Sequence, residues 1–310
     1  MRPGRIAFPT LSFAAVLLAA AFLAGCGGAA GKSAVTDRAG KTVALPKEIN
    51  TIISTAPSNS EIIIGLGLGG KIIAADEYSA ALDGINKDIT LIDFSYPDGE
   101  TIITLNPDII IAAGHNQTVS GDDPFRLMGE AGIAVVYIPT SDSIEGIYAD
   151  IRFIAELLRV PEKGGELVAG MKAEIDAVAG RIGSITERRS VYIELSPPPY
   201  IVSLGQKTYL HEMAEVIGAD NIFADQEGWF SPSAEAVIDR NPDVIITFLD
   251  DIDTFTADLK ERPGFGEVAA VRNNRVFKLD ANSASRPSQN IILALKQMAH
   301  AVYPEIYEAP

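Results

Sequence analysis

The sequence predicts an α/β protein built from two copies of one unit, each copy with a parallel sheet. Residues 100–111 (ETIITLNPDIII) and 235–246 (EAVIDRNPDVII) share a glutamate, an isoleucine three residues later, Asn-Pro-Asp and a closing Ile-Ile. Upstream of each copy, residues 60–76 and 210–225 read as a helix that ends in glycine, followed by a short strand with Ala-Asp. Two similar lobes leave one cleft between them, where small ligands usually bind.

The first lobe begins with a strand that runs straight into a helix. Residues 51–57 (TIISTAP) are rich in β-branched side chains and end at a proline, which is typical of a strand. Ser58 and Glu61 have the spacing of a capping box, so we expect the helix to begin there. The other elements predicted in this lobe are a strand at 71–75, a helix from 98 that Asn106-Pro107 stops, a buried strand at 108–113, a helix at 123–131 and a strand at 133–139.

The second lobe repeats this order of strands and helices, which predicts a second open parallel sheet. Its predicted elements are strands at 191–195, 221–224, 244–249 and 275–279, with helices at 208–217, from 235, and within 256–271.

Two further helices, at 143–158 and 166–182, are predicted between the lobes. The second has apolar residues at alternating spacings of three and four, as an amphipathic helix requires. Two interpretations remain open on this pattern. Either a long helix joins the lobes and resists hinge motion, or the helix packs within one lobe.

The N-terminus reads as an export signal. Arg2 and Arg5 form a basic segment, and an almost uncharged apolar run follows through Gly25. About twenty apolar residues can also span a bilayer, so a membrane-anchoring helix is the alternative. The run ends in Leu-Ala-Gly-Cys, which resembles the bacterial lipobox and favours cleavage before Cys26 and lipid attachment to its thiol.

Cys26 is the only cysteine, so the mature chain has no disulfide and no cysteine-ligated metal. The small residues that follow it have the composition of a flexible tether. The predicted organisation is a signal peptide at 1–25, a tether at 26–34, an N-terminal α/β lobe at 35–145, a helical connection at 146–187 and a C-terminal α/β lobe at 188–310.

Composition and motifs exclude several functional classes. The formal net charge is −16, and removal of the signal with Arg2 and Arg5 makes it two units more negative, so nucleic acid is a poor partner. No Gly-x-Ser-x-Gly elbow and no phosphate-binding loop occurs, which argues against an enzyme. The three histidines, His115, His211 and His300, are scattered and do not form the ligand set of a free-metal receptor.

These residues together resemble the periplasmic-binding-protein family of the iron-siderophore and vitamin B12 type, the solute receptors of ABC importers. The resemblance runs from Val35 to the end of the chain. It implies two Rossmann-like lobes joined by a long rigid helix, a ligand held in the cleft between them, and a monomer that docks on a permease dimer with its ATPase. It is carried by TAPSNSE at 55–61, GLGLG at 65–69, Glu100 with LNPD at 105–108, GADNIF at 218–223, Trp229, and Glu235 with NPD at 241–243.

Glu100 and Glu235 occupy equivalent places in the repeat, each near the start of a helix. A carboxylate there is favoured by the helix dipole by roughly 0.3–1 kcal/mol, which is a sufficient structural reason for either one. The resemblance instead implies that one surface glutamate per lobe docks into an arginine pocket of the permease. Two separated carboxylates in two basic sockets set register as well as affinity.

For the cleft we expect aromatic side chains, because they cover the broad face of a chelate with little loss of entropy. Any single aromatic is more often a core residue than a ligand contact, and Arg286 has a solvated surface charge as its alternative. His115 follows a strand end in a predicted loop and is a candidate contact or iron ligand. The candidate ligand-binding residues are Tyr78, Phe94, Tyr96, His115, Tyr200, Trp229 and Arg286.

The ligand that the sequence ranks first is an iron chelate such as a ferric siderophore, with cobalamin close behind and haem as a further alternative. No resident cofactor is expected. A catecholate complex needs several cationic contacts, and the candidates are Arg286, Lys207 and Arg126. Haem needs an axial Tyr or His. Two other classes stay open, a sensory or adhesive surface lipoprotein and an enzyme on the same scaffold.

Overall fold

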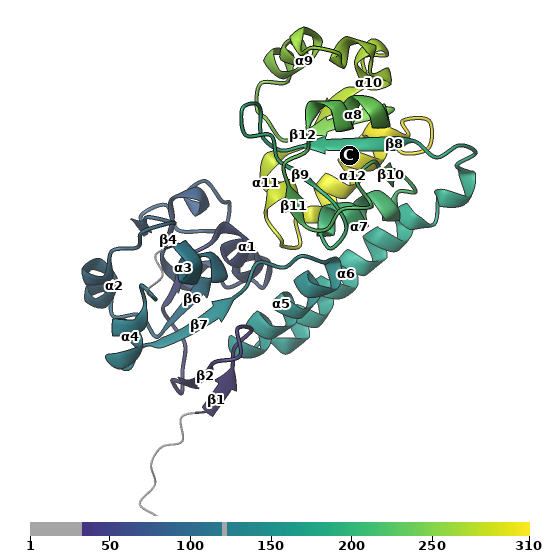
Figure 1. The fold of residues 1–310 in the computed structure, drawn as a ribbon. Coiled ribbons are helices and arrows are strands. Elements are labelled where there is room, and N and C mark those ends of the chain that lie inside the picture. The colour runs from purple at the N-terminus through teal and green to yellow at the C-terminus, as the bar shows by residue number, and fades with distance from the viewer. Residues whose placement is uncertain (1–32, 120–122) are drawn as a thin grey trace, which may run out of the picture. The chain divides into compact units, whose positions relative to one another are not determined.

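The computed structural model describes residues 33–119 and 123–310 (Figure 1). The predicted signal peptide, Cys26 and most of the tether lie outside the described residues. No helix in the described part is long and apolar enough to cross a membrane. Ser33–Thr36 (β1) pairs antiparallel with Thr42–Leu45 (β2), a hairpin that the sequence analysis did not predict.

The first half contains a parallel five-stranded sheet in the order β5-β4-β3-β6-β7. The central strand β3 pairs in parallel with both β4 and β6. This sheet confirms the open parallel arrangement expected from alternating strands and helices. Its strands are Ile52–Ser54 (β3), Ile72–Asp76 (β4), Thr90–Ile92 (β5), Ile109–Ala113 (β6) and Ala134–Ile138 (β7).

The second half contains a four-stranded sheet in the order β10-β8-β12-β13, again parallel throughout. A separate antiparallel pair joins Ser203–Leu204 (β9) to Trp229–Phe230 (β11). The second half is therefore a shorter version of the first, with an added two-stranded ribbon. The strands of its main sheet are Ser190–Glu194 (β8), Asp220–Asn221 (β10), Val244–Thr247 (β12) and Val276–Lys278 (β13).

Helices follow the strands in both halves (Figure 1). In the first half these are Pro57–Gly65 (α1), Gly99–Leu105 (α2), Gly114–Val119 (α3) and Arg126–Glu130 (α4). Between the halves come Ile144–Leu157 (α5) and Pro161–Ala179 (α6). The second half has Tyr209–Val216 (α7), Ala234–Arg240 (α8), Ile252–Glu261 (α9), Ala269–Arg272 (α10), Ala281–Ser285 (α11) and Ile291–Val302 (α12).

The repeated Asn-Pro-Asp segment forms the same turn in both halves. Asn106 and Asn241 end α2 and α8 in the left-handed conformation, with φ 46° and 44°. Asparagine tolerates this conformation better than most residues, and the proline that follows cannot continue a helix. The Asp108 carboxylate then accepts the Asn50 N–H at 2.7 Å, and the Asp243 carboxylate accepts the Ser190 N–H at 2.8 Å. Each aspartate therefore ties its strand to the start of the neighbouring central strand.

Alternation along the strands divides the apolar residues into three cores. In β12, Val244 and Ile246 belong to one core, whereas Ile245 between them belongs to another. Successive side chains of a strand point to opposite faces, so each sheet is covered on both sides. One core lies within the first half and one within the second, and the third and largest includes residues of both halves.

The helical connection contacts both halves. Helix α5 packs against α1 of the first half, and α6 packs against α7 and α12 of the second. The two connecting helices also pack on each other and lie side by side in teal in Figure 1. The connection is therefore a pair of packed helices, and α6 also reaches the first half, because Lys163 Nζ donates to the Leu66 carbonyl at 3.2 Å.

Three local predictions were wrong. The capping box does not form, because Ala56 precedes α1 and no side chain caps it. The single helix expected within 256–271 is broken into α9 and α10, because Gly264 after Pro263 adopts a positive φ of 83°. His115 lies in the short helix α3 and not in a loop.

Candidate functional site

Three aromatic rings gather beyond the carboxyl ends of the first sheet's strands. The rings of Tyr78 and Phe94 meet edge to face with centroids 5.7 Å apart, and Phe94 stacks on His115 at 4.6 Å. Tyr78 is 57% exposed, whereas Phe94 and His115 are half-buried. In open α/β sheets this edge is where ligands bind. The three residues therefore form an aromatic surface at the expected place.

One exposed carboxylate and two buried polar side chains hold Phe94 in this position. Its N–H donates to the Glu77 carboxylate at 2.8 Å, and its carbonyl accepts from Asn116 Nδ2 at 2.8 Å. Asn116 Oδ1 in turn accepts the Thr55 hydroxyl at 2.7 Å. The sequence analysis did not identify Glu77, Asn116 or Thr55 as support for the site. The only sequence signal of Glu77 and Asn116 is a place just after a predicted strand end, and Thr55 lies within the strand predicted at 51–57.

Asp76 supports Tyr78 in a similar way. Its carboxylate accepts the N–H groups of Tyr78 and Ser79 at 2.9 and 3.2 Å and the Ser79 hydroxyl at 2.6 Å. The Ser79 hydroxyl continues to Ser60 and then to Ser54, which ends the central strand. Burial raises the pKa of Asp76 because the charged form is poorly solvated there. This chain of hydroxyls fixes the strand ends beneath the aromatic surface.

Arg286 reaches the same place from the second half of the chain. Its Nη1 lies 3.0 Å from the Glu61 carboxylate of α1, and both side chains are largely buried. The Ser288 hydroxyl also donates to Glu61, and Arg286 Nη2 lies 3.4 Å from the Tyr78 carbonyl. The expected alternative for Arg286, a solvated surface charge, is therefore wrong. Glu61, taken from sequence as a capping residue, is the ionic partner of Arg286 from a position 225 residues away.

A cavity of about 120 Å³ lies where these groups meet. It brings together three of the predicted site residues, Phe94, His115 and Arg286, with the start of α1. Ligand pockets usually hold about 300–1,000 Å³, so this cavity accepts a part of a chelate and not the whole molecule. Its other walls include Ala113 at the end of β6, residues 138–140 at and just beyond the end of β7, and Asp150 of α5.

The other predicted aromatics do not line this cavity. Trp229 lies on the ribbon strand β11, opposite Leu204, and is 50% exposed. Tyr200 is 80% exposed on the loop between β8 and β9, and Tyr96 is 71% exposed after β5. All three are surface residues, so none of them is a core aromatic. No strand was predicted at 229–230, but Trp229 is held there by its pairing with Leu204.

The second sheet's central strand ends in a closed ion pair. Glu194 is fully buried and lies 2.8 Å from Arg262, which also pairs with Asp258 at 2.6 Å. The Tyr192 hydroxyl donates to Glu194 at 3.0 Å. Arg262 lies over the ring of Phe265 with 5.4 Å to its centroid. The sequence analysis did not predict this pair, because its partners come from distant segments.

Each cation proposed for an anionic chelate has a carboxylate partner. Lys207 lies 2.6 Å from Glu227, and Arg126 lies 2.7 Å from Glu130 one helical turn away. Arg286 pairs with Glu61, as described above. Within residues 33–119 and 123–310, no cluster of three or more His, Asp or Glu side chains could hold a metal ion.

Glu100 and Glu235 lie in the first turns of α2 and α8, and both are exposed. Asp98 and Ser233 cap these two helices. No salt bridge to either glutamate is present among the described residues. Helix capping is thus supplied by other side chains, which leaves both carboxylates available on the surface.

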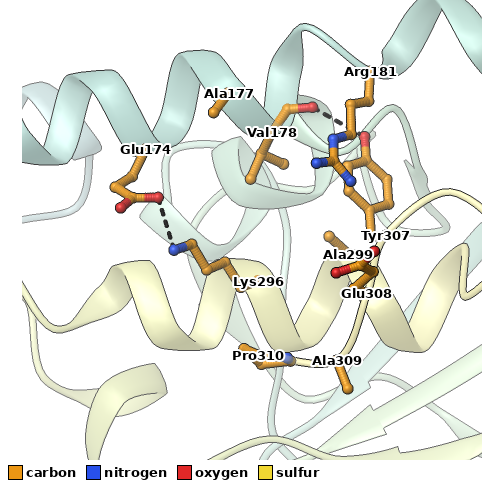
Figure 2. A pocket seen from close by; sticks show the side chains of 10 residues that line it. All are labelled: Glu174, Ala177, Val178, Arg181, Lys296, Ala299, Tyr307, Glu308, Ala309 and Pro310. Atoms are coloured by element: carbon orange, nitrogen blue, oxygen red, sulfur yellow. Dashed lines mark hydrogen bonds and ion pairs between the residues drawn. The ribbon is translucent and has the colours of Figure 1, made fainter.

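A second cavity, of about 240 Å³, lies between α6, α12 and the last residues described (Figure 2). Three of its charged groups have partners, because Lys296 pairs with Glu174 at 2.7 Å and Arg181 donates to the Ile306 carbonyl at 3.1 Å. The Tyr307 hydroxyl donates to the Val178 carbonyl, as Figure 2 shows. This cavity contains none of the predicted site residues, and we interpret it as a gap between packed elements.

Comparisons with known proteins point to one family. A family model described as periplasmic binding protein matches residues 52–283. The chain is 31% identical to an uncharacterized ABC transporter substrate-binding lipoprotein, YvrC of Bacillus subtilis, over 96% of this chain and 98% of that protein. It is 26% identical to a vitamin B12-binding protein of Vibrio campbellii, over 80% of this chain and 87% of that protein.

Solved structures show the same fold. A possible iron-binding periplasmic protein of Staphylococcus epidermidis superposes with a TM-score of 0.76 at 29% identity, over 83% of this chain and 100% of that one. The periplasmic heme-binding protein RhuT of Roseiflexus gives a TM-score of 0.72 at 24% identity, over 83% of this chain and 98% of that one. The two-lobed α/β architecture predicted from the internal repeat is thereby confirmed.

Proposed function

The chain belongs to the periplasmic binding protein family, and from this premise we propose that it captures a corrinoid, a cobalt macrocycle of the cobalamin type, and delivers it to an ABC permease. At the level that the family sets, it is an exported substrate-binding protein of an ABC transporter, and proteins of this kind are not enzymes. Its partners at that level are a permease and an ATPase.

The pairing of Arg286 with Glu61 is the observation that favours a corrinoid over an anionic iron chelate. Arg286 is the only Arg or Lys among the described residues that line the cavity, and its charge is balanced by a carboxylate 3.0 Å away. An anionic catecholate complex would have to compete with Glu61 for this guanidinium. A macrocycle with little net charge needs no such cation and is covered by aromatic faces such as Tyr78 and Phe94.

The likeness to vitamin B12-binding proteins supports the same choice. The iron chelate that the sequence ranked first remains the alternative. It keeps support from the likeness to a possible iron-binding protein. We rank the corrinoid above it because Lys207 and Arg126, the other candidate cations, are also paired.

A titration of the purified chain tests this proposal. Trp229 is the only tryptophan, so its fluorescence reports on ligand near β11. We expect saturable binding and quenching with cyanocobalamin, and much weaker binding of a ferric tris-catecholate. Calorimetry gives the affinities independently of the fluorescence. Saturable binding of the ferric complex or hemin, with none of cyanocobalamin, would refute the corrinoid.

We also propose that Glu100 and Glu235 dock on the permease and that Cys26 carries lipid. Both glutamates are exposed at equivalent helix starts, which supports two similar contacts. For Cys26, the Cys26→Ser variant should lose labelling by a fatty-acid analogue and leave the membrane fraction, while its ligand affinity stays unchanged. Labelling that persists in this variant would reject the lipidation site.

A further inference from the structure

No side chain caps the start of α1, as is also true of α4, α6, α10 and α12. Ala56 occupies the capping position, and Pro57 has no N–H to offer. The first N–H groups of a helix have no partner within it, which here leaves those of Ser58 and Asn59. This helix end lines the 120 Å³ cavity. By contrast, side chains cap α2, α5, α7, α8, α9 and α11.

A second observation at this place points to a ligand. Asn59 is among the residues that line the cavity, and it is only 3% exposed. Its Nδ2 has no hydrogen-bond partner among the described residues. Buried amide donors are nearly always satisfied, because an unmade hydrogen bond costs free energy in a medium without water. The Asn59 amide and the first N–H groups of α1 are therefore hydrogen-bond donors that a ligand oxygen could satisfy.

The charges around the cavity cancel in pairs. Arg286 is balanced by Glu61, and Asp150 is balanced by Arg38 at 2.6 Å and accepts a hydrogen bond from the Ser141 hydroxyl at 2.5 Å. A carboxylate from the ligand would gain from the helix end but would enter beside the Asp150 carboxylate. An uncharged carbonyl oxygen gains the same hydrogen bonds without this repulsion.

We propose that this cavity is a subsite for a carbonyl oxygen of the ligand, that of a peripheral carboxamide group, received by Asn59 Nδ2 and the N–H groups at the start of α1. The stacked rings of Phe94 and His115 form its side wall. The subsite rests on the proposed function, because a corrinoid carries carboxamides around its ring. Its small volume suits one such group while the macrocycle lies outside it.

The test compares two ligands on two proteins by calorimetry. Cyanocobalamin carries peripheral carboxamides, whereas cobyrinic acid carries carboxylates at the same positions. For the wild-type chain we expect tighter binding of cyanocobalamin. Asn59→Ala should weaken cyanocobalamin binding about tenfold, the effect of one lost hydrogen bond. Equal affinities of wild type and Asn59→Ala for cyanocobalamin, both proteins being folded, would overturn the subsite.

The isosteric variant Asn59→Asp covers the case in which alanine prevents folding. It removes the donor, keeps the side-chain shape and adds a negative charge, so it should weaken cobyrinic acid binding more than cyanocobalamin binding. Asn273→Ala is the control, because Asn273 is exposed at the end of α10 and does not line the cavity. Normal cyanocobalamin affinity of Asn59→Asp would contradict the proposal.

Failure of the subsite can be told apart from failure of the proposed function. If wild type binds cyanocobalamin and the Asn59 variants bind it equally well, only the subsite is wrong. If wild type binds neither corrinoid, the proposed function is wrong, and the same proteins are titrated with ferrioxamine B, a ferric chelate that carries uncharged amide carbonyl oxygens. Equal affinities of wild type and the Asn59 variants for ferrioxamine B, or no binding of it, would then reject the subsite as well.

Discussion

The two halves of the molecule are alike where their strands begin and different where their strands end. At the beginnings, Asp108 and Asp243 accept backbone N–H groups of the neighbouring strand at 2.7 and 2.8 Å. Asn106 and Asn241 precede them with nearly the same left-handed dihedral angles. The Asn-Pro-Asp repeat is therefore a structural device that needs no ligand to explain it.

At the strand ends the halves differ in chemistry. In the first half, β3 leads through Thr55 and Ala56 directly into an uncapped helix beside a cavity. In the second, β8 ends at Glu194, whose carboxylate Arg262 neutralises inside the core. The repeated residues therefore preserve the helix ends and the strand pairing of each sheet. The polar and aromatic groups at the strand ends differ between the two halves.

The largest effect should come from opening the ion pair of the second half. Arg262→Ala leaves the fully buried Glu194 without its charge partner, so we expect the free energy of unfolding to fall by about 3–5 kcal/mol. Urea denaturation followed by circular dichroism measures the loss. The matched variant at the strand ends of the first half is Arg286→Ala, in which Glu61 of α1 loses its partner from the second half.

The Arg286→Ala loss should be smaller, about 1–3 kcal/mol, because Ser288 still donates to Glu61 and Glu61 also borders a surface pocket where water can solvate it. If Arg286→Ala lowered the free energy of unfolding as much as Arg262→Ala, Glu61 would be as fully excluded from solvent as Glu194, which would contradict the difference between the two halves.

The next largest effect should come from Glu100 and Glu235, the exposed glutamates that the two halves present at equivalent helix starts. Each charge-assisted contact contributes about 1.5–3 kcal/mol, so Glu100→Ala and Glu235→Ala should each raise the receptor concentration for half-maximal ATPase stimulation roughly tenfold to a hundredfold. The double variant should be worse than either single one, while cyanocobalamin affinity stays unchanged. Normal transport by the double variant, or loss of cyanocobalamin binding, would reject docking by these residues.

Trp229→Ala tests whether the ribbon of the second half takes part in binding. We expect cyanocobalamin affinity to fall by roughly 1–3 kcal/mol, the cost of losing a large aromatic contact. Because Trp229 is 50% exposed, the melting temperature should change little. Calorimetry and a thermal melt measure the two quantities, and Trp229→Phe serves as a control that keeps a ring. A large loss of stability with normal affinity would make Trp229 a framework residue.

The smallest effect is a pH dependence of stability that comes from Asp76 in the first half. Burial raises the pKa of Asp76 above its ordinary value of 3.8. The stability that this group contributes is therefore fully present below pH 3.8 and is lost as the pH rises through its folded-state pKa. Asp76→Asn has no such titration. Its free energy of unfolding, measured in urea at several pH values, should rise relative to wild type as the pH increases above 3.8, and a difference constant with pH would contradict this.

Much of the fold could be predicted from sequence because its signals are local. The Asn-Pro-Asp turns and the apolar runs after them specify helix ends and buried strands within a few residues. The break at Gly264 could also have been predicted, since Pro-Gly pairs mark turns. The site was less predictable. The pairing of Glu61 with Arg286 joins segments 225 residues apart, and no local pattern indicates it.

The shared core has a consequence for how the chain reaches its destination. Helix α12 supplies Ile291, Leu295, Met298 and Val302 to the core that runs through both halves, and each is at most 1% exposed. It packs on α6, α7 and β12, so this core stays open to water until residue 302 has been delivered. A chain exported N-terminus first therefore cannot finish folding while its last helix is still inside the translocation channel. Molecules cut short before α12 would expose this apolar surface and become substrates for the proteases that survey the cell envelope.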